Sequence, residues 1–273
     1  MKPYYEDTAS GITIYHGEAL KVLASLPDAS VDAVITDPPY SSGGQFRGDR
    51  AGGTTTTKYV KTGTQIVRPD FAGDTRDQRG FTYWCSLWLS ECLRVARPSS
   101  PIAVFTDWRQ LPTTTDAIQA GGWVWRGVVG WDKTSVVRPS MGRFASQMEF
   151  VVWGSAGAMP LERGVGCLPG VIRCSVRQDD KYHITGKPTE VMQEVCAVCE
   201  PGGVVLDPFM GSGTTLVAAK NLGRRAVGIE ISEAYCEIAA ERLSQNVIRF
   251  PPPGSHTANE PQPALELGDE AAP

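Results

Sequence analysis

Hydrophobic and polar positions follow two short periods along the first 40 residues. Ile12 and Ile14 flank a threonine, which indicates a strand. The next stretch, 17–26, carries leucines on one face at helical spacing, and the apolar run at 31–35 is typical of a second, buried strand. This run leads into Thr-Asp-Pro-Pro-Tyr at residues 36–40. Because two prolines cannot continue a central strand, the chain is expected to leave the sheet there.

Helices between short apolar strands return after residue 80. The predicted helices cover residues 81–98, 112–121, 188–199, 214–222 and 233–245, and the predicted strands cover 102–105, 123–131, 147–153, 204–206 and 226–229. Such alternation is typical of a doubly wound sheet with helices on both faces. The sequence therefore predicts an α/β fold with a mostly parallel sheet.

Three stretches lack this periodicity. Residues 41–80 hold eight glycines and seven threonines, with seven Lys or Arg against four Asp, and are interpreted as a mobile basic loop. Residues 155–182 are irregular and rich in glycine. Residues 251–273 are rich in Pro, Ala and acidic residues, which indicates a disordered acidic tail. We therefore expect one globular domain over residues 1–250, followed by this tail.

Composition and charge narrow the class of protein. Hydrophobic residues make up 41% of the 273 positions and charged residues 21%, which is ordinary for a globular protein. The formal net charge is −4, and the tail alone carries four acidic residues and no Lys or Arg. Residues 1–250 therefore sum to zero, so a contact with nucleic acid has to come from a local basic patch.

Other classes of protein and site are disfavoured by simple patterns. No run of 18 apolar residues occurs and residues 1–11 lack an apolar signal core, so neither a membrane span nor secretion is expected. Seven cysteines without dense spacing are typical of a reducing cytoplasm. Cys196 and Cys199 have the spacing of half a zinc site but share the apolar face of a predicted helix. No metal site is therefore predicted.

The loop after the predicted strand at 204–206 indicates a ligand site. The strand leads into Asp207, a Gly-x-Gly turn at 211–213 follows, and a helix begins at 214. Glycines let the backbone approach a ligand, and a helix N-terminus offers free N–H groups. The next strand ends at Glu230, where a carboxylate can accept hydrogen bonds from two ribose hydroxyls. This half of the chain therefore predicts a site for a nucleoside cofactor.

A nicotinamide dinucleotide is one candidate for that cofactor. Its fingerprint requires a third glycine three residues after the second, and Leu216 occupies that position here. The carboxylate of Asp207, directly before the turn, also suits a cationic ligand better than a pyrophosphate. A nucleoside-cofactor oxidoreductase is therefore a less favoured alternative.

The second informative loop is Asp-Pro-Pro-Tyr at residues 37–40. A proline turn that closes a strand would explain the prolines but neither flanking residue. The tetrapeptide resembles the catalytic motif of amino-group DNA methyltransferases that use S-adenosylmethionine, and Asp-Pro-Phe-Met-Gly-Ser-Gly-Thr at 207–214 resembles their cofactor loop. The catalytic motif precedes the cofactor loop, which is the circularly permuted order of the beta class. The resemblance covers most of residues 11–245 and implies a Rossmann-like methyltransferase fold.

The resemblance implies roles for the four residues of the catalytic loop. The Asp37 carboxylate and the Pro38 carbonyl would accept hydrogen bonds from the exocyclic amino group of the target base, and so localise a lone pair that is otherwise delocalised into the ring. Pro38 and Pro39 would hold these acceptors in place before the substrate arrives. Tyr40 would stack on the face of the extruded base.

The resemblance also implies contacts with S-adenosylmethionine. Asp207 would face the methionine ammonium, Glu230 would hold the ribose, and the glycines of the turn would give backbone access. Glu18 would contact the adenine amino group of the cofactor, with an exposed first-turn helix acid as the alternative. Lys187, within His-Ile-Thr-Gly-Lys-Pro at 183–188, would help to close the pocket. The predicted cofactor-binding residues are Glu18, Lys187, Asp207, Pro208, Phe209, Gly211, Ser212, Gly213, Thr214 and Glu230.

Double-stranded DNA is the implied substrate, and the target base must leave the duplex. Arg47 and Arg50 lie in the basic loop after the catalytic motif and would close over DNA, with a solvated linker as the alternative. Lys133 and Arg143 are interleaved with tryptophans, a pattern found on DNA-binding surfaces and also in protein cores. Residues 155–182 occupy the place where the family has its target-recognition segment.

The predicted function is site-specific methylation of the N6 amino group of adenine in DNA. Asp37 favours adenine, because the cytosine N4 enzymes of the family more often carry serine at that position. Methylation of cytosine N4 is the nearest alternative, and a non-catalytic DNA-binding relative is less favoured because the Asp37–Tyr40 loop is intact. We expect a cytoplasmic enzyme of the kind found in restriction-modification systems, with a homodimer left open.

Overall fold

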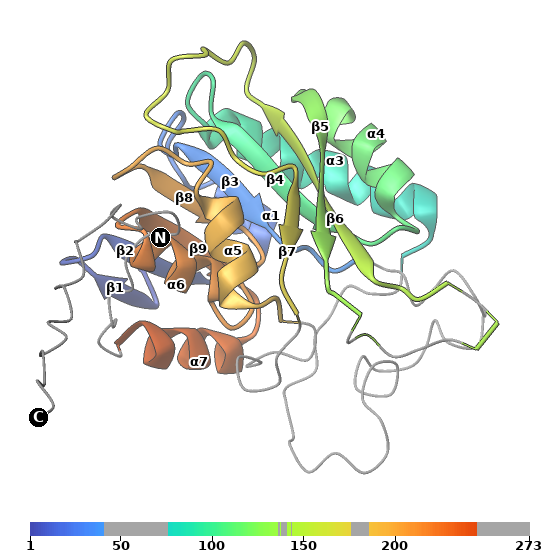
Figure 1. Ribbon diagram of the computed structural model, residues 1–273. Coiled ribbons are helices and arrows are strands. Elements are labelled where there is room, and N and C mark those ends of the chain that lie inside the picture. The colour runs from blue at the N-terminus through green and yellow to red at the C-terminus, as the bar shows by residue number, and fades with distance from the viewer. Residues whose placement is uncertain (41–75, 136, 138–140, 143, 176–185, 245–273) are drawn as a thin grey trace, which may run out of the picture.

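The computed structural model describes residues 1–40, 76–135, 137, 141–142, 144–175 and 186–244. Within these ranges the strands form one sheet in the order β1-β2-β9-β8-β3-β4-β6-β5-β7 (Figure 1). The strands are β1 (Tyr5–Asp7), β2 (Ile12–His16), β3 (Ala33–Thr36), β4 (Pro101–Thr106), β5 (Val124–Asp132), β6 (Met148–Ser155), β7 (Val171–Arg173), β8 (Val204–Asp207) and β9 (Arg225–Glu230). Every pairing from β2 across to β4 is parallel, whereas β1 and β6 pair antiparallel with their neighbours. The predicted mostly parallel sheet is confirmed.

Helices cover both faces of the sheet (Figure 1). One face packs against α1 (Ala19–Leu23), α3 (Gln78–Val95) and α4 (Leu111–Ala120), and the other against α5 (Thr189–Cys196), α6 (Thr214–Asn221) and α7 (Glu233–Ser244). Successive strand residues point to opposite faces. Val34 of β3 accordingly belongs to the core under α3, and Ile35 to the core under α5 and α6.

The winding of the chain reverses between β3 and β8, which are adjacent and parallel. The connection from β3 to β4 includes α3 on one face, and the connection from β8 to β9 includes α6 on the other. In doubly wound sheets, ligands bind in the crevice beyond the carboxyl ends of two such strands. The topology therefore places the expected ligand site where β3 and β8 end.

Both of these central strands are short and fully buried, as their continuous apolar runs predict. The strand β3 ends at Thr36, and the next residues include Pro38 and Pro39, which have no N–H to add to the ladder. The chain consequently turns away at the carboxyl edge of the sheet, with Asp37 and Tyr40 in the turn.

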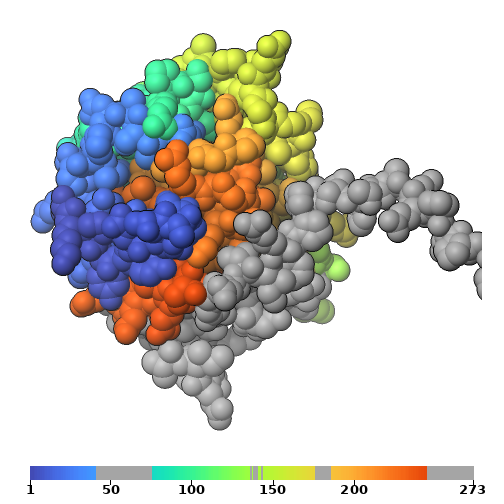
Figure 2. Space-filling model, turned by 90° about the vertical axis from the view of Figure 1, so that its left-hand side faces the viewer, coloured from blue at the N-terminus to red at the C-terminus, as the bar shows by residue number. Residues whose placement is uncertain are grey.

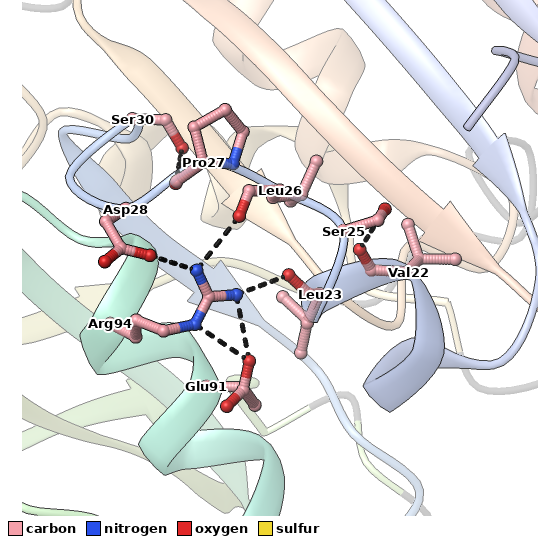
Figure 3. Close-up of polar contacts among 9 residues, drawn as sticks. All are labelled: Val22, Leu23, Ser25, Leu26, Pro27, Asp28, Ser30, Glu91 and Arg94. Atoms are coloured by element: carbon pink, nitrogen blue, oxygen red, sulfur yellow. Dashed lines mark hydrogen bonds and ion pairs between the residues drawn. The ribbon is translucent and has the colours of Figure 1, made fainter.

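Arg94, near the end of α3, fixes the connection between α1 and β3 (Figure 3). Its guanidinium donates hydrogen bonds to the carbonyl oxygens of Leu23 (2.7 Å) and Leu26 (3.0 Å), and it pairs with the carboxylates of Asp28 and Glu91. A planar guanidinium with five donors suits a turn that presents several acceptors. These contacts hold α3 against the turn that leads into β3.

The start of the chain closes one edge of the sheet. The strand β2 pairs in parallel with β9, and β1 adds an antiparallel edge strand. Figure 2 shows this N-terminal segment, in blue, lying against the C-terminal part of the chain, in orange and red. His16 and Glu230 are paired in register at the ends of β2 and β9.

Several predicted boundaries are wrong. The helix α3 begins at Gln78, inside the predicted 41–80 loop, because Asp77 accepts a hydrogen bond from the N–H of Gly80 (2.8 Å) and caps the helix. It ends at Val95 rather than at Pro98. The remainder of the predicted loop, residues 41–75, lies outside the described residues.

Other differences concern short elements. Neither β1 nor β7 was predicted, and β7 interrupts the segment 155–182 that was expected to be irregular. Strands of three residues carry too little periodicity to be recognised from sequence, and their pairing partners define them. The helix α5 ends at Cys196 and not at Cys199, although both cysteines are buried in the core as expected. Residues 176–185 and 245–273, which include the predicted acidic tail, lie outside the described residues.

None of the described helices is both long and apolar enough to cross a membrane.

Candidate active site

The carboxyl ends of β3 and β8 bring the two informative loops together. The hydroxyl of Thr36 donates a 2.6 Å hydrogen bond to Oδ1 of Asp207, and both side chains are buried. Asp37 directly follows Thr36, and the glycine-rich turn directly follows Asp207. Segments separated by 171 residues in the sequence therefore meet at one edge of the sheet and form a single site.

Asp37 is held by hydrogen bonds to both carboxylate oxygens. Its Oδ2 lies 2.7 Å from the ammonium nitrogen of Lys187, and its Oδ1 accepts a 2.5 Å hydrogen bond from the hydroxyl of Tyr40. Burial raises the pKa of Asp37, and the Lys187 charge and these hydrogen bonds oppose that rise. The carboxylate is thus a fixed acceptor, with 21% of the side chain still exposed at the site.

Lys187 approaches Asp37 from the segment that precedes α5. Its side chain is only 5% exposed, and its Nζ also lies 3.4 Å from Oε2 of Glu149 on β6. Burial alone would lower the pKa of Lys187, but the charges of Asp37 and Glu149 outweigh this and raise it. The lysine therefore stays charged in the interior of the site.

Tyr40 lies beside this ion pair. The Nζ of Lys187 is 5.1 Å from the centroid of the Tyr40 ring, within the range of a cation–π contact. Burial, with the nearby charge of Asp37, raises the pKa of Tyr40 well above its usual value, so the phenol remains a hydrogen-bond donor. The ring is partly buried against the apolar core under α5 and α6.

The glycine-rich turn requires glycine at two positions. The φ angle is +52° at Gly211 and +79° at Gly213, in the left-handed region that favours glycine. A Cβ atom at Gly213 would also lie 2.8 Å from the Cβ of Ala239 in α7. The N–H of Met210 donates to the carbonyl of Ile229 (3.0 Å) and so ties the turn to β9. This geometry delivers the N-terminus of α6 to the carboxyl edge of the sheet.

The hydrogen-bond partners of Asp207 found among the described residues carry no positive charge. Its carboxylate accepts from the hydroxyls of Thr36 and Thr215 and from the N–H of Phe209 (3.0 Å). Burial raises the pKa of Asp207 to about 6, and the hydrogen bonds oppose only part of this shift. A cationic ligand group beside Asp207 would favour the ionised carboxylate, so the residue fits an ammonium group.

Glu230 ends the neighbouring strand β9 with a fixed carboxylate. Its Oε2 accepts from the N–H of Gly211 (3.0 Å), and its Oε1 accepts from the N–H of Ser232 (2.8 Å). Burial raises its pKa, and these N–H groups oppose the rise. Each oxygen retains acceptor capacity, so the residue fits the hydroxyls of a ribose.

Comparison with known proteins identifies the family. A family model described as DNA methylase, for N6 and N4 methyltransferases, matches residues 31–160 and 170–241. The chain belongs to this family of amino DNA methyltransferases. The type II methyltransferase M.HinfI of Haemophilus influenzae is 30% identical over 258 residues, which cover 85% of this chain and 68% of M.HinfI.

Solved structures support the same fold for this methyltransferase. M1.HpyAVI, determined as a complex with SAM, superposes with a TM-score of 0.59 at 23% identity and covers 85% of this chain and 98% of its own. The cytosine-N4-specific PvuII DNA methyltransferase superposes with a TM-score of 0.67 at 17% identity and covers 90% of each chain. The predicted Rossmann-like methyltransferase fold is therefore confirmed.

The remaining residues of the glycine-rich loop pack against neighbouring elements of this methyltransferase, and their predicted contacts with the cofactor stay predictions. The Phe209 ring lies 5.2 Å from the rings of both Trp84 and Trp88 on α3, so it anchors the loop to that helix. Arg242 of α7 donates to the carbonyl of Ser212 (2.6 Å) and holds the turn from the other side. Pro208, Ser212 and Thr214 are buried.

Glu18 caps α1. Its carboxylate accepts hydrogen bonds from the N–H groups of Leu20 (3.2 Å) and Lys21 (3.1 Å), which is the usual role of an N-cap side chain. Glu18 is half-buried and precedes the first helical turn, which contains no acidic residue, so the alternative of an exposed first-turn acid does not describe it. A contact between Glu18 and the cofactor stays a prediction.

The structure describes only one of the four predicted DNA-binding residues, Lys133. Arg47, Arg50 and Arg143 lie outside the described residues. Lys133 is described, and its ammonium group lies 3.1 Å from Oε1 of Glu149 with only 15% of the side chain exposed. The structure therefore turns Lys133 toward a carboxylate within the site.

Two residues of the site escaped the sequence interpretation. Glu149 bridges Lys133 and Lys187, and Arg242 holds the glycine-rich turn. The sequence does contain a signal for Glu149, because it is a charged residue directly before the apolar run Phe150–Trp153. No sequence signal marks Arg242, because a basic residue in the last turn of a helix is common.

Proposed function

We propose that this protein transfers a methyl group from S-adenosylmethionine to the N6 amino group of adenine in double-stranded DNA. The proposal rests on one observation: the two loops meet where the hydroxyl of Thr36 on β3 donates a hydrogen bond to the carboxylate of Asp207 on β8. Family membership supplies the reaction class, namely methylation of an amino group in DNA. The order of the two loops along the chain supports assignment to the permuted beta class.

Three groups of the glycine-rich half fit the proposed cofactor. S-adenosylmethionine supplies a methyl group activated on a sulfonium. Asp207, with a raised pKa and uncharged partners, suits the methionine ammonium. Glu230 suits the ribose hydroxyls, and the backbone at Gly211 allows close approach. The relative M1.HpyAVI, with the same fold, was solved with SAM, which supports this choice.

The catalytic half presents acceptors for an amino group. Oδ1 of Asp37 and the carbonyl of Pro38 would accept the two amino hydrogens and localise the nitrogen lone pair toward the methyl donor. In the structure, the Tyr40 hydroxyl donates a hydrogen bond to Oδ1 of Asp37, and the arriving amino group would replace it. The Tyr40 ring would then stack on the base, offsetting part of the few kcal/mol that base extrusion costs.

Adenine is proposed as the target because of the carboxylate at position 37. Incubation of the protein with mixed-sequence DNA and radiolabelled S-adenosylmethionine, followed by digestion to nucleosides, tests this choice. Label in N6-methyl-2′-deoxyadenosine would support the proposal, and label in N4-methyl-2′-deoxycytidine would move the target to cytosine. Wild-type protein that binds both substrates but transfers no label would contradict the enzymatic assignment.

Two substitutions at Tyr40 separate its ring from its hydroxyl. Tyr40→Phe keeps the ring and removes a hydrogen bond that the target amino group would replace in any case, so we expect kcat/KM to change by less than about tenfold. Tyr40→Ala removes a stacking platform worth about 1–3 kcal/mol per base, so we expect a fall of roughly ten- to a hundredfold. Steady-state kinetics on a short duplex measure both. Equal losses in the two variants would assign the role to the hydroxyl instead.

A further inference from the structure

Glu149 is a mostly buried carboxylate on β6, directly before the apolar run Phe150–Trp153. Its side chain is 21% exposed, with Oε1 3.1 Å from the ammonium of Lys133 and Oε2 3.4 Å from that of Lys187. Burial would raise the pKa of Glu149, but the two neighbouring ammonium groups outweigh this and lower it. The residue is therefore ionised and paired with two cations.

Four charged side chains alternate in sign across the carboxyl edge of the sheet. They run from Lys133 beyond β5, through Glu149 on β6 and Lys187 before α5, to Asp37 after β3. Their formal charges sum to zero. The last member of the row is Asp37, which in the proposed function accepts a hydrogen bond from the target amino group.

Lys187 is the member whose position needs the most support. A lysine ammonium is a compact charge on a flexible four-carbon stem, so one ion pair does not fix its place. Here it is shared between Asp37 (2.7 Å) and Glu149 (3.4 Å), and it lies 5.4 Å from the centroid of the Phe105 ring. Removal of Glu149 would leave Asp37, the group that Lys187 is meant to hold, as its one anionic partner among the described residues.

We propose that Glu149 is a positioning residue for methyl transfer, which fixes Lys187 so that Lys187 holds one oxygen of Asp37 and leaves the other for the target amino group. Lys133 is the outer anchor of Glu149. This inference rests on the proposed function. In this inference Lys187 holds the Asp37 carboxylate, and Lys133 acts inside the site by holding Glu149.

Glu149→Gln tests the inference, because glutamine keeps the shape and removes the charge. We expect kcat for methyl transfer to fall by about ten- to a hundredfold, while KM for DNA and the Kd for S-adenosylmethionine change by less than about threefold. The matched control is Glu200→Gln, which removes a half-exposed partner of Arg163 far along the sequence and is expected to leave kcat unchanged. An unchanged kcat in a folded Glu149→Gln protein would overturn the inference.

A double-mutant cycle shows whether Glu149 acts through Lys187. If it does, Glu149→Gln combined with Lys187→Gln lowers kcat no further than Lys187→Gln alone. Independent, multiplicative losses would overturn the inference, because a merely stabilising Glu149 would give them. Should Glu149→Gln fail to fold, Glu149→Asp keeps the charge on a shorter stem, and we expect a lower kcat at unchanged KM. Wild-type kcat in that variant would then contradict the inference.

A substitution at Lys133 tests whether this residue anchors Glu149 or contacts DNA. Lys133→Met is expected to lower kcat modestly and to leave the salt dependence of DNA binding unchanged. A phosphate contact would instead weaken DNA binding and lower the salt slope by about one, and that result would overturn the role given to Lys133. Inactive wild-type protein would count against the proposed function itself, whereas an active wild type with unaffected variants would count only against this inference.

Discussion

Asp37→Asn is expected to lower kcat for methyl transfer by at least about a thousandfold, while the affinity for S-adenosylmethionine changes little. Loss of a single preorganised electrostatic group costs about a hundred- to a thousandfold in other enzymes. Here the change also removes the anionic partner of Lys187, which lies 2.7 Å away. The amide would present one acceptor oxygen, and its NH₂ group would repel the donors that surround position 37.

Single-turnover kinetics with labelled S-adenosylmethionine measure the rate, and calorimetry measures cofactor binding. Asp116→Asn, at an exposed position on α4, is the matched control and should behave as wild type. Asp37→Ala should be equally inactive and still bind the cofactor. If both Asp37 variants lost cofactor binding together with activity, the loop would be structural and its assigned role wrong.

Asp207→Asn is expected to have opposite effects on binding and on stability. Binding of S-adenosylmethionine should weaken by about ten- to a hundredfold, because the ammonium would lose its buried anionic partner. The unliganded protein should become more stable at pH 8, since ionised Asp207 is costly to bury. A shift of the pKa to about 6 corresponds to a destabilisation of about 3 kcal/mol at high pH.

The sign of the pH dependence follows from the direction of that shift. Because the folded-state pKa of Asp207 is raised, its contribution to stability is full below about pH 4 and is lost as the pH rises through about 6. Chemical denaturation should thus show wild type less stable than Asp207→Asn at pH 8, with the difference vanishing near pH 4. A variant that is less stable at pH 8 and binds the cofactor normally would contradict both roles.

The sequence contains enough information to predict the sheet and its two central loops, for physical reasons. Fully buried parallel strands such as β3 and β8 are continuous apolar runs, and prolines or glycines end them. The φ angles of Gly211 and Gly213 are positive, so the residue type itself carries the conformation. The position of Asp37 and Asp207 beside each other then follows from the adjacency of two parallel strands.

The sequence does not reveal which charged side chains pair with one another in the site. Lys187 pairs with Asp37 and Lys133 pairs with Glu149, and neither pairing was predicted; their predicted contacts with the cofactor and with DNA stay predictions. A motif fixes where a residue lies in the chain, but its partner depends on which strands are neighbours. The antiparallel insertion of β6 between β4 and β5 brings Glu149 to the site, and no local pattern encodes that order.

A crystal structure of the protein with S-adenosylhomocysteine and a duplex that contains its target tests the central claim most directly. We predict that the cofactor lies over Gly211 with its ammonium at Asp207 and its ribose at Glu230. We also predict that an extruded adenine stacks on Tyr40, with its amino group at Asp37. A cofactor bound away from the carboxyl ends of β3 and β8, or a base that leaves Tyr40 and Asp37 untouched, would contradict the account.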